Sequence, residues 1–185
     1  IFSFSFLLII SSLISTATRY IYNFSIGPRY SADDLGYYGQ AFKFHQIPYN
    51  VITSTITGVS YPVFSSLNNE KERQMLYIQK IMRMTAFITF PVMIGLYCIA
   101  PNFISVILTD KWMPMLPYFK IMILAGMAMP FINLNLNIFN VIGKPRIYFQ
   151  MEFLRNGLII ALLFVLNSTI EIMLYGYLIA TYTTL

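Results

Sequence analysis

Three basic side chains lie inside apolar stretches of this sequence, at Arg19, Lys43 and Lys120. A cation in such surroundings usually pairs with an acid or faces a water-filled cavity, where it can bind an anion. Lys43 is the deepest of the three, about 12 Å into its predicted helix at 1.5 Å per residue. We predict that Lys43 binds an anionic group, assisted by Arg19 and Lys120. The alternative is that these long side chains reach the nearest aqueous boundary.

A second set of polar side chains consists of Asn133, Asn137 and Asn140, at positions i, i+4 and i+7. This spacing places three amides along one face of a helix. Such a face either hydrogen-bonds a neighbouring helix or lines a polar cavity that can bind sugar hydroxyls. A similar stripe on another segment is formed by Asn50, Thr53 and Thr57.

Groups that usually carry catalysis or bind metals are scarce. The single histidine, His45, is expected to be buried and hydrogen-bonded, and the single cysteine, Cys98, excludes a disulfide or a cysteine metal site. Asp33 and Asp34 form the only acidic pair, which is better interpreted as acids at a helix start than as a metal or acid-base site. No glycine-rich phosphate-binding loop occurs. We therefore expect no catalytic residue, no metal and no cofactor.

The composition identifies the elements that must position these residues. Of 185 residues, 57% are hydrophobic and 10% are charged, whereas a soluble domain has about 25% charged residues. Twelve basic and seven acidic side chains are too few to cover a water-facing surface. These numbers exclude an ordinary soluble domain, a disordered chain and a coiled coil, and they favour a membrane protein.

Charge-free runs indicate how often the chain crosses the membrane. They cover residues 1–18, 46–69, 84–109, 121–143, 156–170 and 172–185. A membrane-spanning helix needs about 20 mostly apolar residues, and the first four runs approach or exceed this length. The fifth qualifies if it starts near residue 147 and if Glu152 and Arg155 lie near its end, where charges can reach the interface. The first run could also be a signal peptide, but no basic segment precedes it.

The predicted fold is therefore an all-α, polytopic transmembrane bundle of six helices. We expect the helices at about 1–25, 35–66, 76–108, 114–142, 146–166 and 170–185. The second and third exceed the thickness of the hydrocarbon, so each must tilt or bend. Pro48 and Pro91 are the predicted hinges, because a proline inside a helix removes a backbone hydrogen bond.

The basic residues also predict the orientation of the bundle. Seven of them lie in or beside the second and fourth connections: Lys71, Arg73, Lys80, Arg83, Lys144, Arg146 and Arg155. Arg29 and Lys111 are the two in the remaining connections. The positive-inside rule therefore places the second and fourth connections in the cytoplasm. This asymmetry explains most of the net charge of +5 without a nucleic-acid partner.

Four segments resemble a known family. Residues 34–44 (DLGYYGQAFKF) followed by Pro48 are similar to the lGxYxxAxxl…P signature of bacterial polysaccharide exporters. Residues 60–65 (SYPVFS) resemble the PxxS helix end, and residues 90–96 (FPVMIGL) resemble the xPxxxGL segment. The run before Lys111-Trp112 resembles lxgxkW. In this order, the segments resemble the Wzx-type polysaccharide transporters of the multidrug/oligosaccharidyl-lipid/polysaccharide superfamily.

This resemblance implies a fold and a function. Members have two six-helix bundles, and the chain resembles the second, so residues 1–185 are expected to be the C-terminal transmembrane bundle of a larger transporter. The implied function is translocation of undecaprenyl-pyrophosphate-linked oligosaccharides across the bacterial inner membrane by alternating access. The implied partners are the lipid-linked oligosaccharide, membrane lipids, and the polysaccharide polymerase and export machinery. The acidic ion-coupling residues of the drug-exporting relatives have no counterpart here, so the coupling ion stays open.

Two other functions remain open at this point. One is a different transporter of the same superfamily, such as a drug exporter or a flippase for peptidoglycan precursors. The other is a membrane enzyme of polysaccharide assembly, which would need a large outward loop with catalytic Arg, His or Asp. No predicted connection is long enough for such a loop.

Overall fold

The computed structural model describes residues 2–66, 71–141 and 145–185, and these ranges are almost entirely helical. The predicted all-α fold with six helices is confirmed, and no strand occurs in the described ranges. A short 3₁₀-helix, η1 (Asp110–Met115), lies between the third and fourth helices. The six helices are α1 (Phe2–Ile26), α2 (Ala32–Ser66), α3 (Lys71–Leu108), α4 (Leu116–Val141), α5 (Pro145–Val165) and α6 (Ile170–Thr183).

The start of α2 differs from the prediction, because the helix begins three residues earlier, at Ala32. The backbone N–H of Asp34 donates to Ser31 Oγ at 3.1 Å, and the backbone N–H of Ser31 donates to Asp34 Oδ2 at 3.2 Å. This reciprocal pair is a capping box that satisfies two amides at the helix start. The interpretation of Asp33 and Asp34 as helix-start acids is therefore confirmed.

Removing this cap has a modest expected effect. Ser31→Ala should lower the free energy of unfolding by about 1 kcal/mol, because the Asp34 amide loses its acceptor. Thermal unfolding of the detergent-solubilised protein measures the change. The matched control is Ser54→Ala, whose hydroxyl only donates to the carbonyl of Val51 within the helix. Equal losses in the two variants would contradict a capping role for Ser31.

Helix α4 forms the centre of the bundle and packs against α2, α3 and α6. Most of its first half is buried, and Gly126 lies where α2 and α3 approach it. A Cβ atom at Gly126 would lie 2.9 Å from Met93 Cε and 3.6 Å from His45 Cδ2. The predicted burial of His45 is confirmed, since none of its surface is exposed, but the expected hydrogen bond is not found, because neither ring nitrogen has a hydrogen-bond partner among the described residues.

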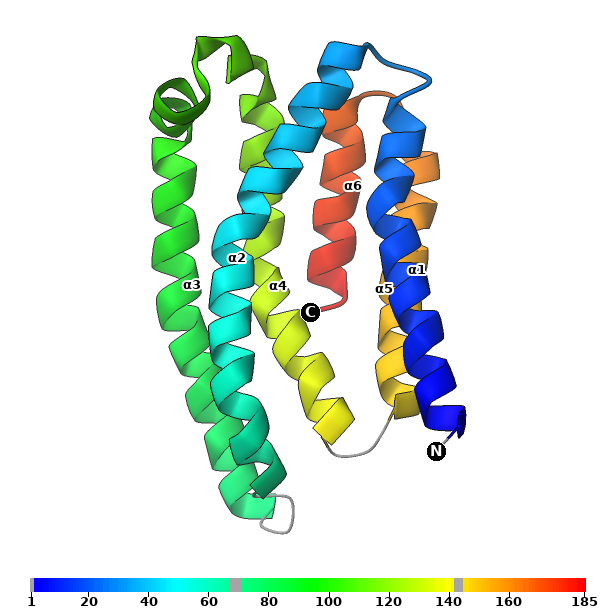
Figure 1. The fold of residues 1–185 in the computed structure, drawn as a ribbon, viewed down its shortest axis with the longest axis vertical. Coiled ribbons are helices and arrows are strands. Elements are labelled where there is room, and N and C mark those ends of the chain that lie inside the picture. The colour runs from blue at the N-terminus through cyan, green and yellow to red at the C-terminus, as the bar shows by residue number, and fades with distance from the viewer. Residues whose placement is uncertain (1, 67–70, 142–144) are drawn as a thin grey trace.

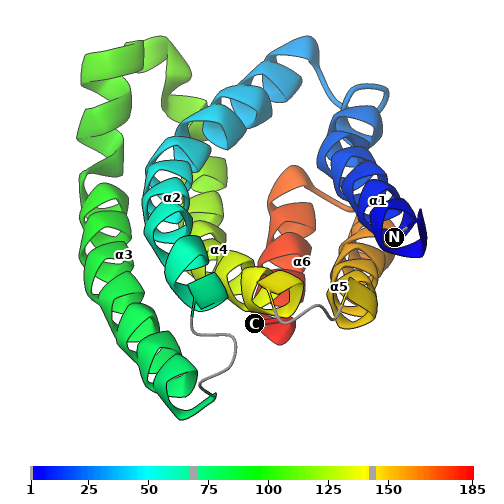
Figure 2. The same ribbon diagram turned by 60° about the horizontal axis from the view of Figure 1, so that its bottom comes forward.

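Helices α1 and α5 form the other side of the bundle. They pack against each other, and α5 also packs against α6, whereas α1 makes few contacts with α2. Viewed toward one end, α2, α3 and α4 lie on one side and α1 and α5 on the other, with α6 between them (Figure 2). The interior is thus walled by helices that are far apart in the sequence.

The outer surface of the bundle is apolar. Among the described residues, three helical stretches are long and apolar enough to cross a membrane: Glu72–Leu108, Asp110–Phe139 and Arg146–Val165. Phe87 and Val106 on α3 are 81% and 83% exposed, as expected for side chains that face lipid. The protein is a membrane protein.

The two predicted hinge prolines lie inside long helices, Pro48 in α2 and Pro91 in α3. Helix α2 changes direction about midway along its length (Figure 1). Proline removes a backbone hydrogen bond and crowds the preceding turn, which accounts for a bend at this level. The role of both residues as hinges in a conformational change stays a prediction.

Candidate functional site

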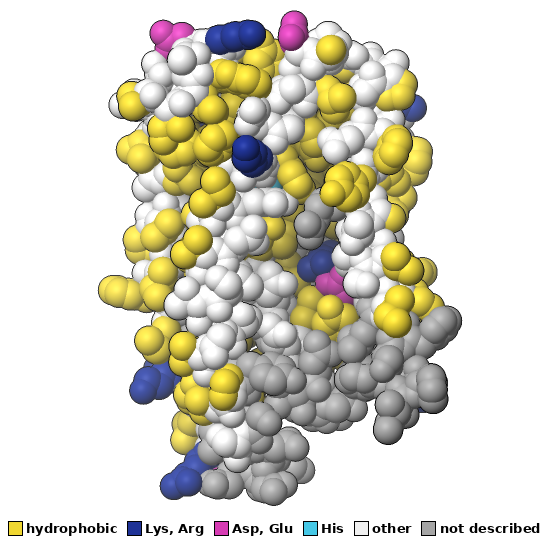
Figure 3. Space-filling view, in the orientation of Figure 1, with side chains coloured by type: hydrophobic (Ala, Val, Ile, Leu, Met, Phe, Trp, Pro, Cys, Tyr) yellow, Lys and Arg dark blue, Asp and Glu magenta, His cyan; other side chains and the backbone are white. Residues whose placement is uncertain are grey.

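A cavity of about 320 Å³ lies between five of the six helices. Its walls come from α1, α2, α4, α5 and α6, and no residue of α3 lines it within the described ranges. On the face shown in Figure 3, the surface is hollowed between α2 and α1, and a basic and an acidic side chain meet in the hollow. The cavity therefore lies where α1 and α2 make few contacts.

Helix α2 supplies the longest wall. Its lining residues recur every three or four positions, which is the spacing of one helix face. They are Tyr38, Phe42, Gln46, Tyr49, Asn50 and Thr53. The other walls are Ser15, Thr18 and Tyr22 of α1; Met122, Met129 and Asn133 of α4; Arg155, Asn156 and Ile159 of α5; and Leu174 and Tyr177 of α6.

Aromatic rings gather at one end of the cavity. Tyr22 and Tyr38 stack with centroids 6.0 Å apart, and Tyr177 meets Tyr22 edge to face at 6.1 Å. Phe42 stacks on Tyr38 at 5.9 Å. These contacts tie α1, α2 and α6 together and give this end flat apolar walls with phenolic groups.

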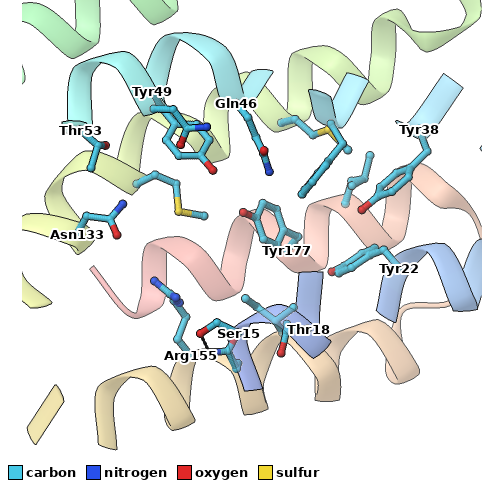
Figure 4. A pocket seen from close by; sticks show the side chains of 17 residues that line it. Ser15, Thr18, Tyr22, Tyr38, Gln46, Tyr49, Thr53, Asn133, Arg155 and Tyr177 are labelled. Atoms are coloured by element: carbon cyan, nitrogen blue, oxygen red, sulfur yellow. Dashed lines mark hydrogen bonds between the residues drawn. The ribbon is translucent and has the colours of Figure 1, made fainter. Parts of the chain in front are cut away.

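Amide, hydroxyl and guanidinium groups occupy the other end. Figure 4 shows Thr53 of α2, Asn133 of α4 and Arg155 of α5 around this part of the cavity, away from Tyr38 and Tyr22. Amides and hydroxyls both donate and accept hydrogen bonds, so they can bind a ligand rich in hydroxyl groups.

Arg155 is the one charged side chain among the described lining residues. Its Nη2 lies 2.5 Å from Glu152 Oε1, one turn earlier on α5. The other oxygen, Glu152 Oε2, accepts from Ser15 Oγ at 2.5 Å and from Asn156 Nδ2 at 3.2 Å. Glu152 is only 4% exposed, so this network joins α1 to α5 inside the bundle.

The sequence interpretation of this pair was wrong. Glu152 and Arg155 were expected near a helix end, where their charges would reach the membrane interface. Instead, α5 begins at Pro145, so Arg155 lies about 15 Å along the helix at 1.5 Å per residue. This length is about half of a 30 Å hydrocarbon layer, and the opposite charges of Glu152 and Arg155 neutralise each other there.

The predicted cations lie elsewhere. Lys43 is exposed on α2 and is not one of the residues that line the cavity. Lys120 is partly buried, with its Nζ 5.0 Å from the ring centroid of Tyr97 on α3, a cation–π contact outside the cavity. The side chain of Arg19 lies outside the described residues.

The predicted asparagine stripe is divided. Asn133 lines the cavity, whereas Asn137 is partly buried and is not a lining residue. The side chain of Asn140 lies outside the described residues. On α2, Asn50 and Thr53 both line the cavity. Thr57, the third member of that stripe, donates to the backbone carbonyl of Thr53 at 2.8 Å.

Several lining residues were missed from the sequence, above all Arg155 and Asn156. Their signal was present, since Glu152, Arg155 and Asn156 stand at i, i+3 and i+4 in an otherwise apolar helix. This spacing places three polar groups on one face. Polar side chains inside the membrane need polar partners within the bundle, and this requirement does not depend on the basic residues in the connections.

The site offers binding groups and no catalytic set. In the part of the chain that the structure describes, no three His, Cys, Asp or Glu residues are grouped to hold a metal ion. The cavity instead combines flat aromatic rings, amides, hydroxyls and one guanidinium. These groups suit a ligand that carries both hydroxyls and an anionic group.

Comparison with known proteins gives related sequences. The teichuronic acid biosynthesis protein TuaB of Bacillus subtilis is 26% identical over 151 residues, which cover 82% of this chain and 31% of that protein. The lipopolysaccharide biosynthesis protein WzxC of Escherichia coli is 24% identical over 92 residues, 50% of this chain and 19% of that protein. The succinoglycan biosynthesis transport protein ExoT of Rhizobium meliloti is 29% identical over 79 residues, which cover 43% of this chain and 16% of that protein. No solved structure matches.

The chain spans less than a third of the length of these relatives. Their names are those of biosynthesis and transport proteins rather than enzymes. A sequence profile described as "Polysaccharide biosynthesis protein" matches residues 1–117, which is more than half of the chain. The resemblance to the Wzx-type transporters is confirmed, and the chain belongs to the polysaccharide biosynthesis protein family.

Proposed function

We propose that this chain is the C-terminal half of a flippase that moves undecaprenyl-pyrophosphate-linked oligosaccharide across the bacterial inner membrane. The supporting observation is the cavity, which places a guanidinium among amides and aromatic rings, about halfway along α5. A pyrophosphate that enters such a low-dielectric region needs fixed positive charge, and Arg155 carries it. The membership of the chain in the family supports the class of substrate.

The sugars are assigned to the amide, hydroxyl and aromatic walls. Gln46, Asn50 and Asn133 can exchange hydrogen bonds with sugar hydroxyls, and the tyrosine rings provide flat surfaces for the apolar faces of sugar rings. A volume of about 320 Å³ is at the lower end of the range for ligand sites. The cavity therefore holds the first sugars and the anionic group, while the remaining saccharide extends beyond it.

The second half of the transporter would complete the pathway. Lys43 is exposed on α2, so in the proposed transporter it can face the second bundle across an aqueous path. Bending at Pro48 in α2 and Pro91 in α3 would change access to the cavity. A polymerase or export protein would then receive the saccharide at the outer face.

Transport by the full-length protein tests this function. The protein is placed in vesicles with a labelled undecaprenyl-pyrophosphate oligosaccharide, and access of an external lectin to the sugar is followed over time. Faster exposure than in protein-free vesicles is expected, and the lipid-facing variant Val106→Ala should behave like the wild type. A rate equal to that of protein-free vesicles would contradict the proposed function.

A further inference from the structure

The ion pair between Glu152 and Arg155 joins a side chain that faces the cavity to a carboxylate that is buried. Arg155 lines the cavity with a partly exposed side chain, while Glu152 lies behind it and is 4% exposed. Within the described residues, Glu152 is the ion-pair partner of Arg155. An anion that enters the cavity therefore meets a guanidinium already engaged by a buried carboxylate.

Arg155 is able to exchange this partner. A guanidinium has five N–H donors in a fixed plane, and a phosphate oxygen pair matches this geometry. The guanidinium does not lose its proton in a protein. When Arg155 pairs with the anion instead, the negative charge of Glu152 is left unpaired.

The surroundings of Glu152 contain no second cation among the described side chains. From α1 it receives the hydroxyl of Ser15, and on α5 its titratable or charged neighbours are Arg155 and Tyr148. The side chains from other elements that line a second hollow beside the pair carry no titratable group: Ile132, Asn135, Leu136 and Phe139 of α4, and Thr184 and Leu185 after α6. From α6, Tyr177 lines the same cavity as Arg155. Arg19 on α1 lies outside the described side chains.

The carboxyl group is placed to remain hydrogen-bonded after it becomes neutral. Ser15 and Asn156 both donate to Oε2, whereas Arg155 engages Oε1. If Arg155 leaves, Glu152 Oε1 loses its partner, while Oε2 keeps its hydrogen bonds from Ser15 and Asn156. A proton on Oε1 would neutralise the buried group, which is the usual response of a carboxylate that loses its cation in a low-dielectric site.

We propose that an anion bound at Arg155 displaces Glu152, and that Glu152 takes up one proton from water in the same step. The Arg155–Glu152 ion pair breaks, the Arg155–anion pair forms, and Glu152 becomes a carboxylic acid held by Ser15 and Asn156. This inference rests on the proposed function, and it adds a titrating group to the anion site. Because one proton is bound with the ligand, affinity must rise as the pH falls.

Calorimetry on the full-length protein tests the exchange. Farnesyl pyrophosphate is titrated in buffers of different ionisation enthalpy, which gives the number of protons taken up per ligand. The control is Glu152→Gln, which keeps an oxygen acceptor for Ser15 and has no carboxyl group to titrate. Protons bound by the ligand itself contribute equally to both proteins. The wild type should take up about one proton more, and its Kd should rise up to about tenfold per pH unit relative to the variant.

Each of the following results would overturn the inference. Equal proton uptake in the two proteins would show that Glu152 keeps its charge, and binding that requires Na⁺ without proton uptake would assign the charge to another cation. No binding by the wild type would overturn the proposed function as well. If Glu152→Gln does not fold, titration of the wild type with a polyprenyl sulfate, whose charge is fixed, measures the same proton. If no proton is taken up in that titration, the exchange is contradicted.

Discussion

Arg155→Ala in the full-length protein is expected to reduce saccharide export by about 30-fold or more, the equivalent of about 2 kcal/mol or above. The reason is that Arg155 is the one charged side chain among the described residues of the cavity. Without it, a pyrophosphate would have to enter a low-dielectric region with no fixed positive charge. Arg155→Lys should retain part of the activity, because the positive charge is kept but the bidentate hydrogen bonding of the guanidinium is lost. Lectin access in vesicles measures the rates.

Two further variants separate this role from a general loss of positive charge. Lys111→Ala removes an exposed cation in η1 and should leave export unchanged. Lys43→Ala tests the cation that the sequence favours, on the exposed side of α2. Full export by Arg155→Ala together with loss in Lys43→Ala would mean that the anion travels along the outer face of α2 and not through the cavity.

Glu152→Ala is expected to destabilise the protein by about 3–5 kcal/mol, because breaking a buried ion pair leaves a charge without compensation. The substitution leaves Arg155 without its partner and removes the acceptor for Ser15, which joins α1 to α5. Thermal unfolding in detergent measures the loss. Glu152→Gln should be milder, since its amide oxygen still accepts a hydrogen bond.

The control for this prediction is Glu171→Ala, which removes an exposed acid in the first turn of α6 and should cost less than about 1 kcal/mol. A double variant, Glu152→Ala with Arg155→Ala, should be more stable than Glu152→Ala alone, because no buried charge is left unpaired. Equal unfolding temperatures for Glu152→Ala and Glu171→Ala would contradict a structural role for the buried pair.

The fold could be predicted because its signals are local. Long charge-free runs separated by Asp110-Lys111 and similar polar turns determine the number of helices, and this number is confirmed. The ends of the helices were less certain, since α2 begins at Ala32 on account of a hydrogen-bond pair between Ser31 and Asp34. A capping box was readable from the sequence once Ser31 was considered with the residue three positions later.

The site could be predicted only in part because it depends on contacts between distant segments. Depth along a helix identifies Lys43 as buried or embedded, but depth does not say which face the side chain occupies. The structure shows that Phe42 and Gln46 line the cavity, whereas Lys43 between them is exposed and does not. Ser15 and Glu152 are 137 positions apart, and no sequence pattern pairs α1 with α5. Arg155 was therefore counted with the interfacial charges.

Photo-crosslinking of the lipid-linked oligosaccharide to the full-length protein tests the cavity most directly. A photoreactive benzoylphenylalanine replaces Gln46 in the cavity, Lys43 on the exposed side of the same helix, or Val106 on the outer surface of α3. If the saccharide is bound between α1, α2, α4, α5 and α6, an adduct forms at position 46 in higher yield than at position 43, and position 106 stays at background. An adduct at position 43 or 106 without one at position 46 would contradict binding in this cavity.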